Sequence, residues 1–206
     1  TLFRSWSNPE VIAKMTEWVA CGGGFIGIGE PTAARHGNQY FQLAHILGVD
    51  REIGLSICKM KYAFTKEKNT HFIMEDMDGD VDFNKDVDHI FVTGGSPRVL
   101  QEKDGSPQIV VNEFGRGRSV YVSGFAFTPE NIRLLHRALF WAAGREGEFN
   151  TWICSNVNTE CAYYPGCKKL VVINNSEKPE KTSVIDRAGK RYNFRLKPHG
   201  MKIADL

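Results

Sequence analysis

A short apolar segment between glycines, residues 25–28, constrains the fold of this chain more than any other stretch. Its length and its isoleucines predict a buried β-strand. Residues 9–21 precede it with apolar side chains at helical spacing, a capping residue at Asn8 and a stop at Gly22. Helix, glycine stop, buried strand and polar loop form the repeating unit of an open α/β sheet. Glu30 is the first polar side chain at the carboxyl end of the strand, where ligands usually bind in such sheets.

Two long helices are predicted, each with one apolar stripe in the core. In the first helix the stripe consists of Val11, Ile12, Met15, Trp18 and Val19. The second helix begins at the cap Thr128, with Pro129 in its first position, and ends at Gly144. Its expected buried stripe consists of Ile132, Leu135, Leu139, Phe140 and Ala143. Trp18 is expected to be a core residue rather than a binding platform.

After the first strand, the sequence predicts a polar loop at residues 32–39 and a short helix at residues 40–48. The loop contains Arg35 and His36. These two side chains either face a ligand together with Glu30, or cap the loop and form salt bridges within it. Both alternatives stay open at the level of sequence.

The middle of the chain contains apolar or alternating segments of strand length at residues 53–62, 71–74, 89–92, 99–102, 107–113 and 119–124. A calcium-binding loop is one interpretation of the alternate aspartates Asp76, Asp78, Asp80 and Asp82. They do not fit one, because the positions that need glycine and a bidentate glutamate hold other residues. We expect a solvated acidic loop and no metal site.

The composition changes after residue 147. Residues 150–206 lack any long helical pattern, and strands are predicted at 169–174, 182–186, 191–196 and 201–206, separated by turns. The expected division is therefore an α/β domain at residues 1–147 and a small antiparallel β domain with its connector at 148–206. The irregular stretch 156–166 holds Tyr163 and Tyr164, which serve either as a plug at a domain interface or as a sugar-stacking platform.

Charge and cysteine content limit the partners and the compartment. The 206 residues include 26 Lys and Arg against 24 Asp and Glu, a formal net charge of +2. These mixed charges create no field that demands nucleic acid or a membrane, and no apolar run approaches the roughly 20 residues that span a bilayer. Five irregularly spaced cysteines predict reduced thiols in a cytoplasmic protein, with a Cys161–Cys167 disulfide as the alternative.

Sequence motifs for catalysis are missing. There is no nucleophile elbow, Walker loop or zinc-protease motif, and the glycines at residues 22–24 precede their strand, unlike a dinucleotide-binding fingerprint. No catalytic residue, metal site or cofactor is therefore predicted. The residues alone indicate a non-catalytic or truncated α/β unit followed by a β tail.

Several stretches carry a resemblance to a known family. They are GGGFIGIGEPTA at residues 22–33, YFQLAHILGVD at 40–50, NTECAYYP at 158–165 and LVVINNS at 170–176. Together they resemble the central and C-terminal domains of the 1,3-β-galactosyl-N-acetylhexosamine phosphorylases, the lacto-N-biose and galacto-N-biose phosphorylases. The resemblance covers nearly the whole chain.

The resemblance implies a fold and a reaction. In that family an N-terminal TIM barrel carries the general acid, followed by a glutamine-amidotransferase-like (flavodoxin-like) α/β domain and a C-terminal β domain. The reaction cleaves a β-1,3-galactosyl-N-acetylhexosamine with phosphate as co-substrate and without a cofactor. Nothing in this chain resembles the barrel, so the resemblance implies a fragment that is inactive alone, braces the barrel and takes part in a possible homo-oligomer.

Glu30, Arg35 and His36 are the residues expected to reach the barrel's site, by the strand-end rule. Two other functions stay open. One is a separate amidotransferase-like enzyme, which would need a nucleophile or a metal beside Glu30. The other is a sugar-binding or assembly module, which would need an exposed aromatic platform, with Trp152, Tyr163 and Tyr164 as its candidates.

Overall fold

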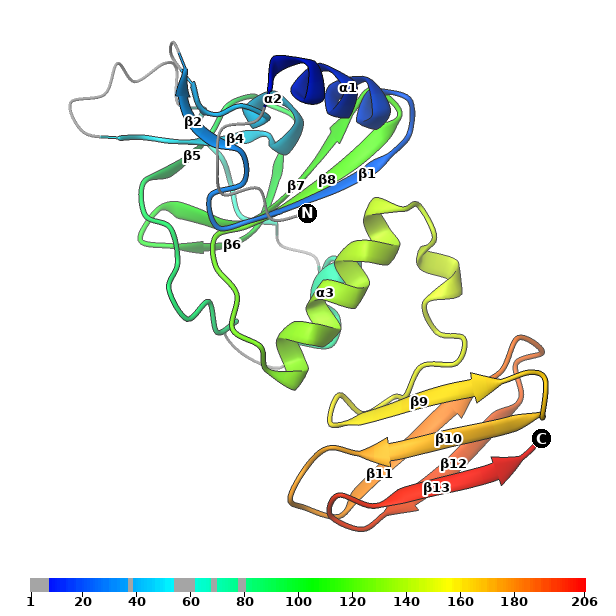
Figure 1. The fold of residues 1–206 in the computed structure, drawn as a ribbon. Coiled ribbons are helices and arrows are strands. Elements are labelled where there is room, and N and C mark those ends of the chain that lie inside the picture. The colour runs from blue at the N-terminus through cyan, green and yellow to red at the C-terminus, as the bar shows by residue number, and fades with distance from the viewer. Residues whose placement is uncertain (1–7, 37–38, 54–61, 68–69, 78–80) are drawn as a thin grey trace. The chain divides into compact units, whose positions relative to one another are not determined.

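The computed structural model describes residues 8–36, 39–53, 62–67, 70–77 and 81–206, with only the backbone of residues 34–36 (Figure 1). The chain divides into two compact units, Thr1–Glu146 and Gly147–Leu206. Each unit has a hydrophobic core of its own.

The first unit is built on a four-stranded mixed sheet. Its strands lie in the order β1 (Gly24–Ile28), β8 (Gly117–Val122), β7 (Ser106–Phe114) and β6 (Arg98–Lys103). β1 and β8 are parallel, with Ile28 opposite Val122, and the other pairs are antiparallel. The predicted α/β class is confirmed. The described strands contain a single parallel pair, however, so a flavodoxin-like sheet is not confirmed.

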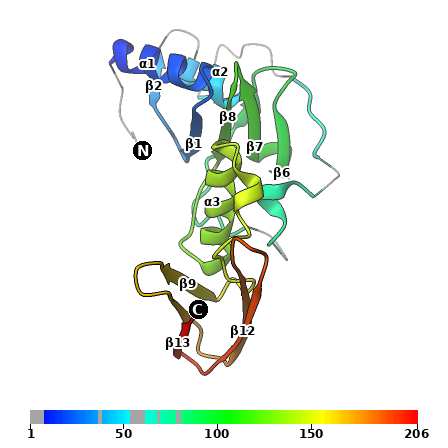
Figure 2. The same ribbon diagram turned by 90° about the vertical axis from the view of Figure 1, so that its right-hand side faces the viewer.

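Helices cover both faces of this sheet (Figure 2). α1 (Pro9–Ala20) and α2 (Ala44–Leu47) pack on one face, and α3 (Pro129–Ala142) packs on the other with the 3₁₀ turn η1 (Phe72–Met74). A second 3₁₀ turn, η2 (Glu146–Glu148), follows α3. The result is a three-layer arrangement, the usual way to bury both faces of a sheet.

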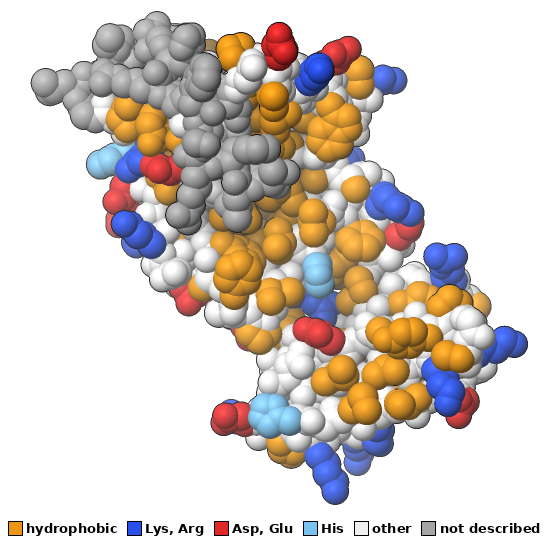
Figure 3. All heavy atoms as spheres, in the orientation of Figure 1, with side chains coloured by type: hydrophobic (Ala, Val, Ile, Leu, Met, Phe, Trp, Pro, Cys, Tyr) orange, Lys and Arg blue, Asp and Glu red, His pale blue; other side chains and the backbone are white. Residues whose placement is uncertain are grey.

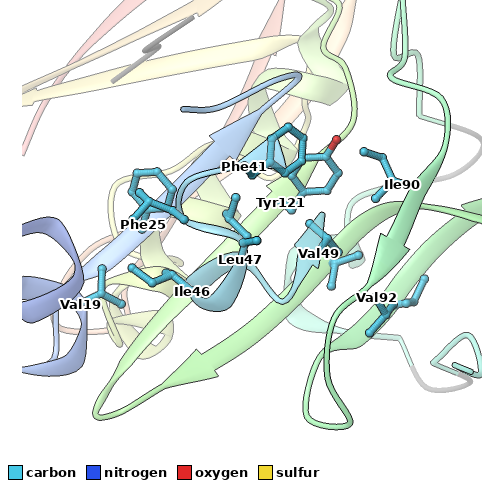
Figure 4. Close-up of a cluster of buried hydrophobic side chains, with 13 residues drawn as sticks. Val19, Phe25, Phe41, Ile46, Leu47, Val49, Ile90, Val92 and Tyr121 are labelled. Atoms are coloured by element: carbon cyan, nitrogen blue, oxygen red, sulfur yellow. The ribbon is translucent and has the colours of Figure 1, made fainter. Parts of the chain in front are cut away.

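Alternation along the strands divides the core into two clusters. Phe25 and Tyr121 point to the cluster under α1 and α2, whereas Ile26 and Val120 point to the cluster under α3. Figure 4 shows the first cluster, in which the rings of Phe41 and Tyr121 lie together, 5.8 Å apart between centroids.

The stretch from residue 32 to residue 48 differs from the prediction. Two strands, β2 (Ala33–His36) and β3 (Gln39–Phe41), lie where a loop and the start of a helix were expected. The helix is only the four residues of α2, ended by Gly48 at φ 74°. The reason is packing: Phe41 is fully buried against Tyr121, and a strand places it there.

β4 (Val49–Arg51) and β5 (Ile90–Val92) form a further antiparallel pair. The predicted strand at residues 71–74 is wrong, because these residues form η1 with His71 as its cap. Most of the predicted strand at 53–62 lies outside the described residues. The predicted strands of the main sheet are confirmed.

α1 has the predicted start, with the Asn8 side chain accepting a hydrogen bond from the backbone N–H of Glu10 at 2.9 Å. The prediction that Trp18 is a core residue is wrong, since it is 57% exposed. Its ring instead covers Gly23, where a Cβ atom would overlap the indole. Of the helix, only Val19 is fully buried.

α3 has the predicted cap, with the Thr128 hydroxyl oxygen accepting from the backbone N–H of Asn131 at 3.2 Å. The predicted buried stripe is wrong. The buried residues are Asn131, Arg133, Leu134, Arg137, Ala138, Trp141 and Ala142. Ile132 and Leu139, expected inside, are 37% and 50% exposed. The helix carries two apolar faces, and the sheet covers the face that also holds both arginines.

The second unit is a small antiparallel β structure, as predicted. One sheet has the order β13 (Met201–Asp205), β10 (Lys169–Asn174), β9 (Thr159–Tyr164), and β11 (Glu180–Ile185) pairs with β12 (Arg191–Leu196). Its core consists of Cys154, Leu170, Val172, Val184 and Leu196. β9 was missed, because the prediction placed an irregular connector there.

Candidate functional site

A polar cluster lies at the carboxyl end of β1 and is the leading candidate site. Glu30 follows the strand, and its Oε1 atom forms an ion pair with Nη1 of Arg51 from β4. The hydroxyl of Tyr40, from β3, donates a hydrogen bond to the same oxygen at 3.1 Å. The Arg51 guanidinium also lies 5.6 Å from the centre of the Tyr40 ring. Three separate strands thus converge on one carboxylate at an accessible edge.

The buried carboxylate of Asp50 holds these partners in place. Oδ1 of Asp50 accepts hydrogen bonds from the backbone N–H groups of Phe41 and Arg51, both at 2.8 Å, and from that of Tyr40 at 3.1 Å. These contacts fix β3 and β4 to each other beside β1. Asp50 is therefore the reason that Tyr40 and Arg51 reach Glu30, although ten and twenty-one residues separate them from it.

Tyr121 of β8 and Ser123, just after this strand, lie at the same end of the sheet. The Tyr121 hydroxyl donates to the carbonyl oxygen of Gly29 at 3.1 Å, and burial raises the pKa of Tyr121, so the phenol stays protonated. Ser123 is fully buried, and its hydroxyl has no hydrogen-bond partner among the described residues. Tyr121 therefore supports the turn that carries Glu30 and does not act as a base.

The described side chains of the cluster offer hydrogen-bonding groups, and none of them is placed as a proton donor from a carboxyl group or as a nucleophile. In both of its contacts Glu30 acts as the acceptor, and Arg51 is occupied by Glu30 and by the carbonyl oxygen of Asp88 at 3.2 Å. Arg35 and His36 lie in β2, but their side chains are outside what the structure describes, so the prediction that they join Glu30 stays a prediction.

Sequence reasoning found Glu30 and missed Tyr40 and Arg51. The only sequence signal for them was their place near predicted element ends, which many residues share. Their convergence depends on the pairing of β2 with β3 and of β4 with β5, which local patterns do not reveal.

A pocket of about 210 Å³ lies beside η1 on the opposite face of the sheet. It is lined by Lys66, Glu67, Thr70, His71, Met74, Met77 and Leu100. Burial, with a smaller effect of the nearby Arg98, lowers the pKa of His71 to about 4, so the imidazole is neutral at pH 7. Nδ1 of His71 accepts from the backbone N–H of Ile73 at 3.3 Å, and the ring packs edge-on against Trp141. These contacts give His71 a structural role.

The acidic residues next to this pocket are also structural. Arg137 forms ion pairs with Glu75 at 2.8 Å and Asp76 at 2.5 Å and donates to the carbonyl oxygen of Phe72 at 3.0 Å. Asp78 and Asp80 lie outside the described residues. Within the described ranges, no group of three or more His, Cys, Asp or Glu side chains could hold a metal ion.

The second unit offers no open aromatic platform at Trp152 and Tyr163. Their rings stack on each other with centroids 4.0 Å apart and planes 9° apart, whereas Tyr164 is exposed. Cys161 and Cys167 are free thiols, so the alternative disulfide is not formed. None of the helices in the described part of the chain is long and apolar enough to cross a membrane.

Comparison with protein families gives two matches along the chain. Residues 3–147 match the model of the lacto-N-biose phosphorylase central domain, and residues 152–204 match that of the lacto-N-biose phosphorylase C-terminal domain.

Curated relatives are phosphorylases. A 1,3-β-galactosyl-N-acetylhexosamine phosphorylase of Lachnoclostridium phytofermentans is 43% identical over 192 residues, covering 93% of this chain and 26% of that protein. One from Bifidobacterium longum is 31% identical, covering 95% and 30%. A D-galactosyl-β-1→4-L-rhamnose phosphorylase of L. phytofermentans is 36% identical, covering 92% and 25%. The chain thus spans about a quarter of the length of the relatives it matches.

The solved structures with a similar fold include β-galactosidases. The enzyme from Rahnella sp. R3 superposes with a TM-score of 0.54 at 15% identity, covering 96% of this chain and 30% of that chain. A GH42 β-galactosidase from G. stearothermophilus gives a TM-score of 0.50 at 14% identity, covering 97% and 30%. At these identities the likeness concerns the fold alone.

Proposed function

This chain belongs to the lacto-N-biose phosphorylase family, and from that membership we propose that it is the central and C-terminal part of a phosphorylase that cleaves β-1,3-galactosyl-N-acetylhexosamines. The observation that carries the proposal is the match, in order, of two domain models from one enzyme. The relative that is 43% identical over 192 residues is named for this activity.

In the proposed reaction, a phosphate oxygen attacks the anomeric carbon of the galactosyl residue as the bond from that carbon to the hexosamine oxygen breaks. A carboxylic acid gives its proton to the departing oxygen. The products are galactose 1-phosphate, inverted at the anomeric carbon, and the N-acetylhexosamine. Because phosphate is the nucleophile, one acid is enough and no cofactor is required.

We place that acid in an N-terminal barrel domain of the parent protein. Glu30 is the leading carboxyl candidate in this chain, and it accepts hydrogen bonds from both Arg51 and Tyr40 instead of being free to donate a proton. We assign the chain a bracing and assembly role, inactive alone, in which Glu30, Arg35 and His36 reach the edge of the barrel's site.

The proposal extends to the architecture and the compartment. We divide the chain between residues 147 and 148, one residue beyond the point where its two compact units separate. The first domain is proposed to be the later part of an amidotransferase-like sheet, because β1 and β8 are parallel and helices cover both faces. The cysteines that the structure describes are free, which supports a cytoplasmic protein.

The test is phosphate-dependent release of galactose 1-phosphate from lacto-N-biose, measured for the full-length parent and for residues 1–206 alone. We expect activity in the parent and none in the 206-residue chain. Activity in the 206-residue chain would overturn the placement of the acid in the barrel domain. A folded parent with no activity on any β-1,3-galactosyl-N-acetylhexosamine would overturn the proposed reaction.

A second candidate reaction has the same chemistry and another acceptor. The relative at 36% identity is named as a D-galactosyl-β-1→4-L-rhamnose phosphorylase. The same assay with galactosyl-rhamnose as substrate separates the two, because the released sugar is rhamnose in one case and N-acetylhexosamine in the other.

A further inference from the structure

α3 has two apolar faces, and its own unit covers one of them. Leu134, Ala138 and Trp141 are buried in the cluster under the sheet. On the other side of the helix, Ile132 and Leu139 are 37% and 50% exposed. The apolar face of a helix is normally buried against another element. The outward face of α3 is therefore suited to a contact that the described residues of its own unit do not supply.

The distribution of charged residues along α3 also indicates that its outward face is suited to a contact. After the exposed Glu130 in its first turn, the charged side chains of α3 are Arg133 and Arg137, and both are buried. Arg137 is held by Glu75 and Asp76 of its own unit. A water-facing helix normally shows the reverse, with cations outward and leucines inward.

The apolar surface continues beyond the helix. Phe127, just before the cap of α3, is 85% exposed and packs edge-on against Phe125. Figure 3 shows hydrophobic side chains gathered over α3 in the orientation of Figure 1. We call the surface made by Phe127, Ile132, Leu135 and Leu139 the outer α3 face.

We propose that the outer α3 face docks onto the domain that precedes the central domain in the full-length phosphorylase, a contact that rests on the proposed function. The matched models are those of a central and a C-terminal domain, and the chain spans about a quarter of its relatives. A preceding domain is therefore available as the occupant in those proteins.

The size of the surface favours a tethered domain over a second copy of the chain. From their exposed fractions, Phe127, Ile132 and Leu139 together expose on the order of 300 Å² of apolar surface. A stable complex of separate proteins needs about 800 Å² on each partner. A covalently linked domain is held at a millimolar effective concentration, so a smaller apolar contact is enough.

Cysteine accessibility tests the contact without using activity. Leu139→Cys is made in the full-length parent and in the 206-residue chain, and maleimide labelling of that position is followed by peptide mass spectrometry. We expect labelling at least tenfold slower in the parent. Val11→Cys, at an exposed apolar position of α1 on the other face of the sheet, is the matched control and should react equally in both. Ile132→Cys replaces Leu139→Cys if that variant does not fold.

Each outcome decides one point. Equal rates at residue 139 in the two proteins would overturn the docking. Slow labelling of the 206-residue chain as well would also overturn the docking. Residue 139 would then be shielded by another part of the same chain or by a second copy of it. Protection in a parent that lacks phosphorylase activity would leave the docking standing and remove the proposed function. A parent that has phosphorylase activity but shows no protection at residue 139 would overturn the docking and leave the proposed function standing.

Discussion

Leu134 and Leu139 lie on opposite faces of α3, so truncating each of them measures which face the unit buries. Leu134 is fully buried under the sheet, and Leu139 is half exposed. Replacing a buried leucine by alanine costs about 3 kcal/mol, from lost transfer free energy plus the cavity. At a half-exposed site the cavity term vanishes and half of the transfer term remains, about 1 kcal/mol. We therefore expect L134A to destabilise the unit by about 2 kcal/mol more than L139A.

The assay is urea unfolding of the 206-residue chain and its two variants, followed by circular dichroism. With a slope of about 2 kcal/mol per molar urea, the difference corresponds to midpoints about 1 M apart. The dependence of the unfolding free energy on urea concentration should have the same slope in both variants as in the unsubstituted 206-residue chain, since neither change alters the surface exposed on unfolding. An L139A variant that loses as much stability as L134A would refute the assignment of the faces, and with it the argument for the outer α3 face.

Two further predictions concern the packing of the first unit. Alanine at Gly117 would place its Cβ on the Val19 carbonyl oxygen, so G117A should cost about 3 kcal/mol in the same titration, whereas G95A, with nothing within 4 Å, should stay within about 0.5 kcal/mol. Equal stabilities would contradict the close approach of α1 and β8. The pKa of His71 is lowered from 6.5 to about 4, so the unfolded state takes up the proton first and stability is lost as pH falls from 6.5 towards 4. His71→Asn should flatten that part of the pH–stability curve, and an unchanged slope would exclude His71 as its source.

The candidate site was only partly accessible from sequence. Glu30 follows from one local rule, that the first polar residue after a buried strand lies at the ligand-binding edge of the sheet. Tyr40 and Arg51 reach it because Asp50 ties β3 to β4. The segment with Tyr40 was predicted as helix, since its apolar spacing fits a helix as well as a strand buried on one side.

Local residues by themselves determined the starts of α1 and α3, the first strand and the strands of the β7–β8 hairpin. Asn8 and Thr128 both act as caps, because a cap needs only its own side chain and the next few backbone amides. The resemblance of residues 22–50 also fixed the family, since family identity is carried by the order of residues.

Only the tertiary structure decided which face of α3 is buried and what surrounds Glu30. Helical spacing places Leu134 and Leu139 on two faces but gives no information about which one the sheet will cover. The choice depends on partners far along the chain, such as Glu75 and Asp76, which hold Arg137 inside the unit. Spacing is a property of neighbouring residues, whereas burial is a property of the elements that pack against them, and in this unit they bury Leu134 and leave Leu139 half exposed.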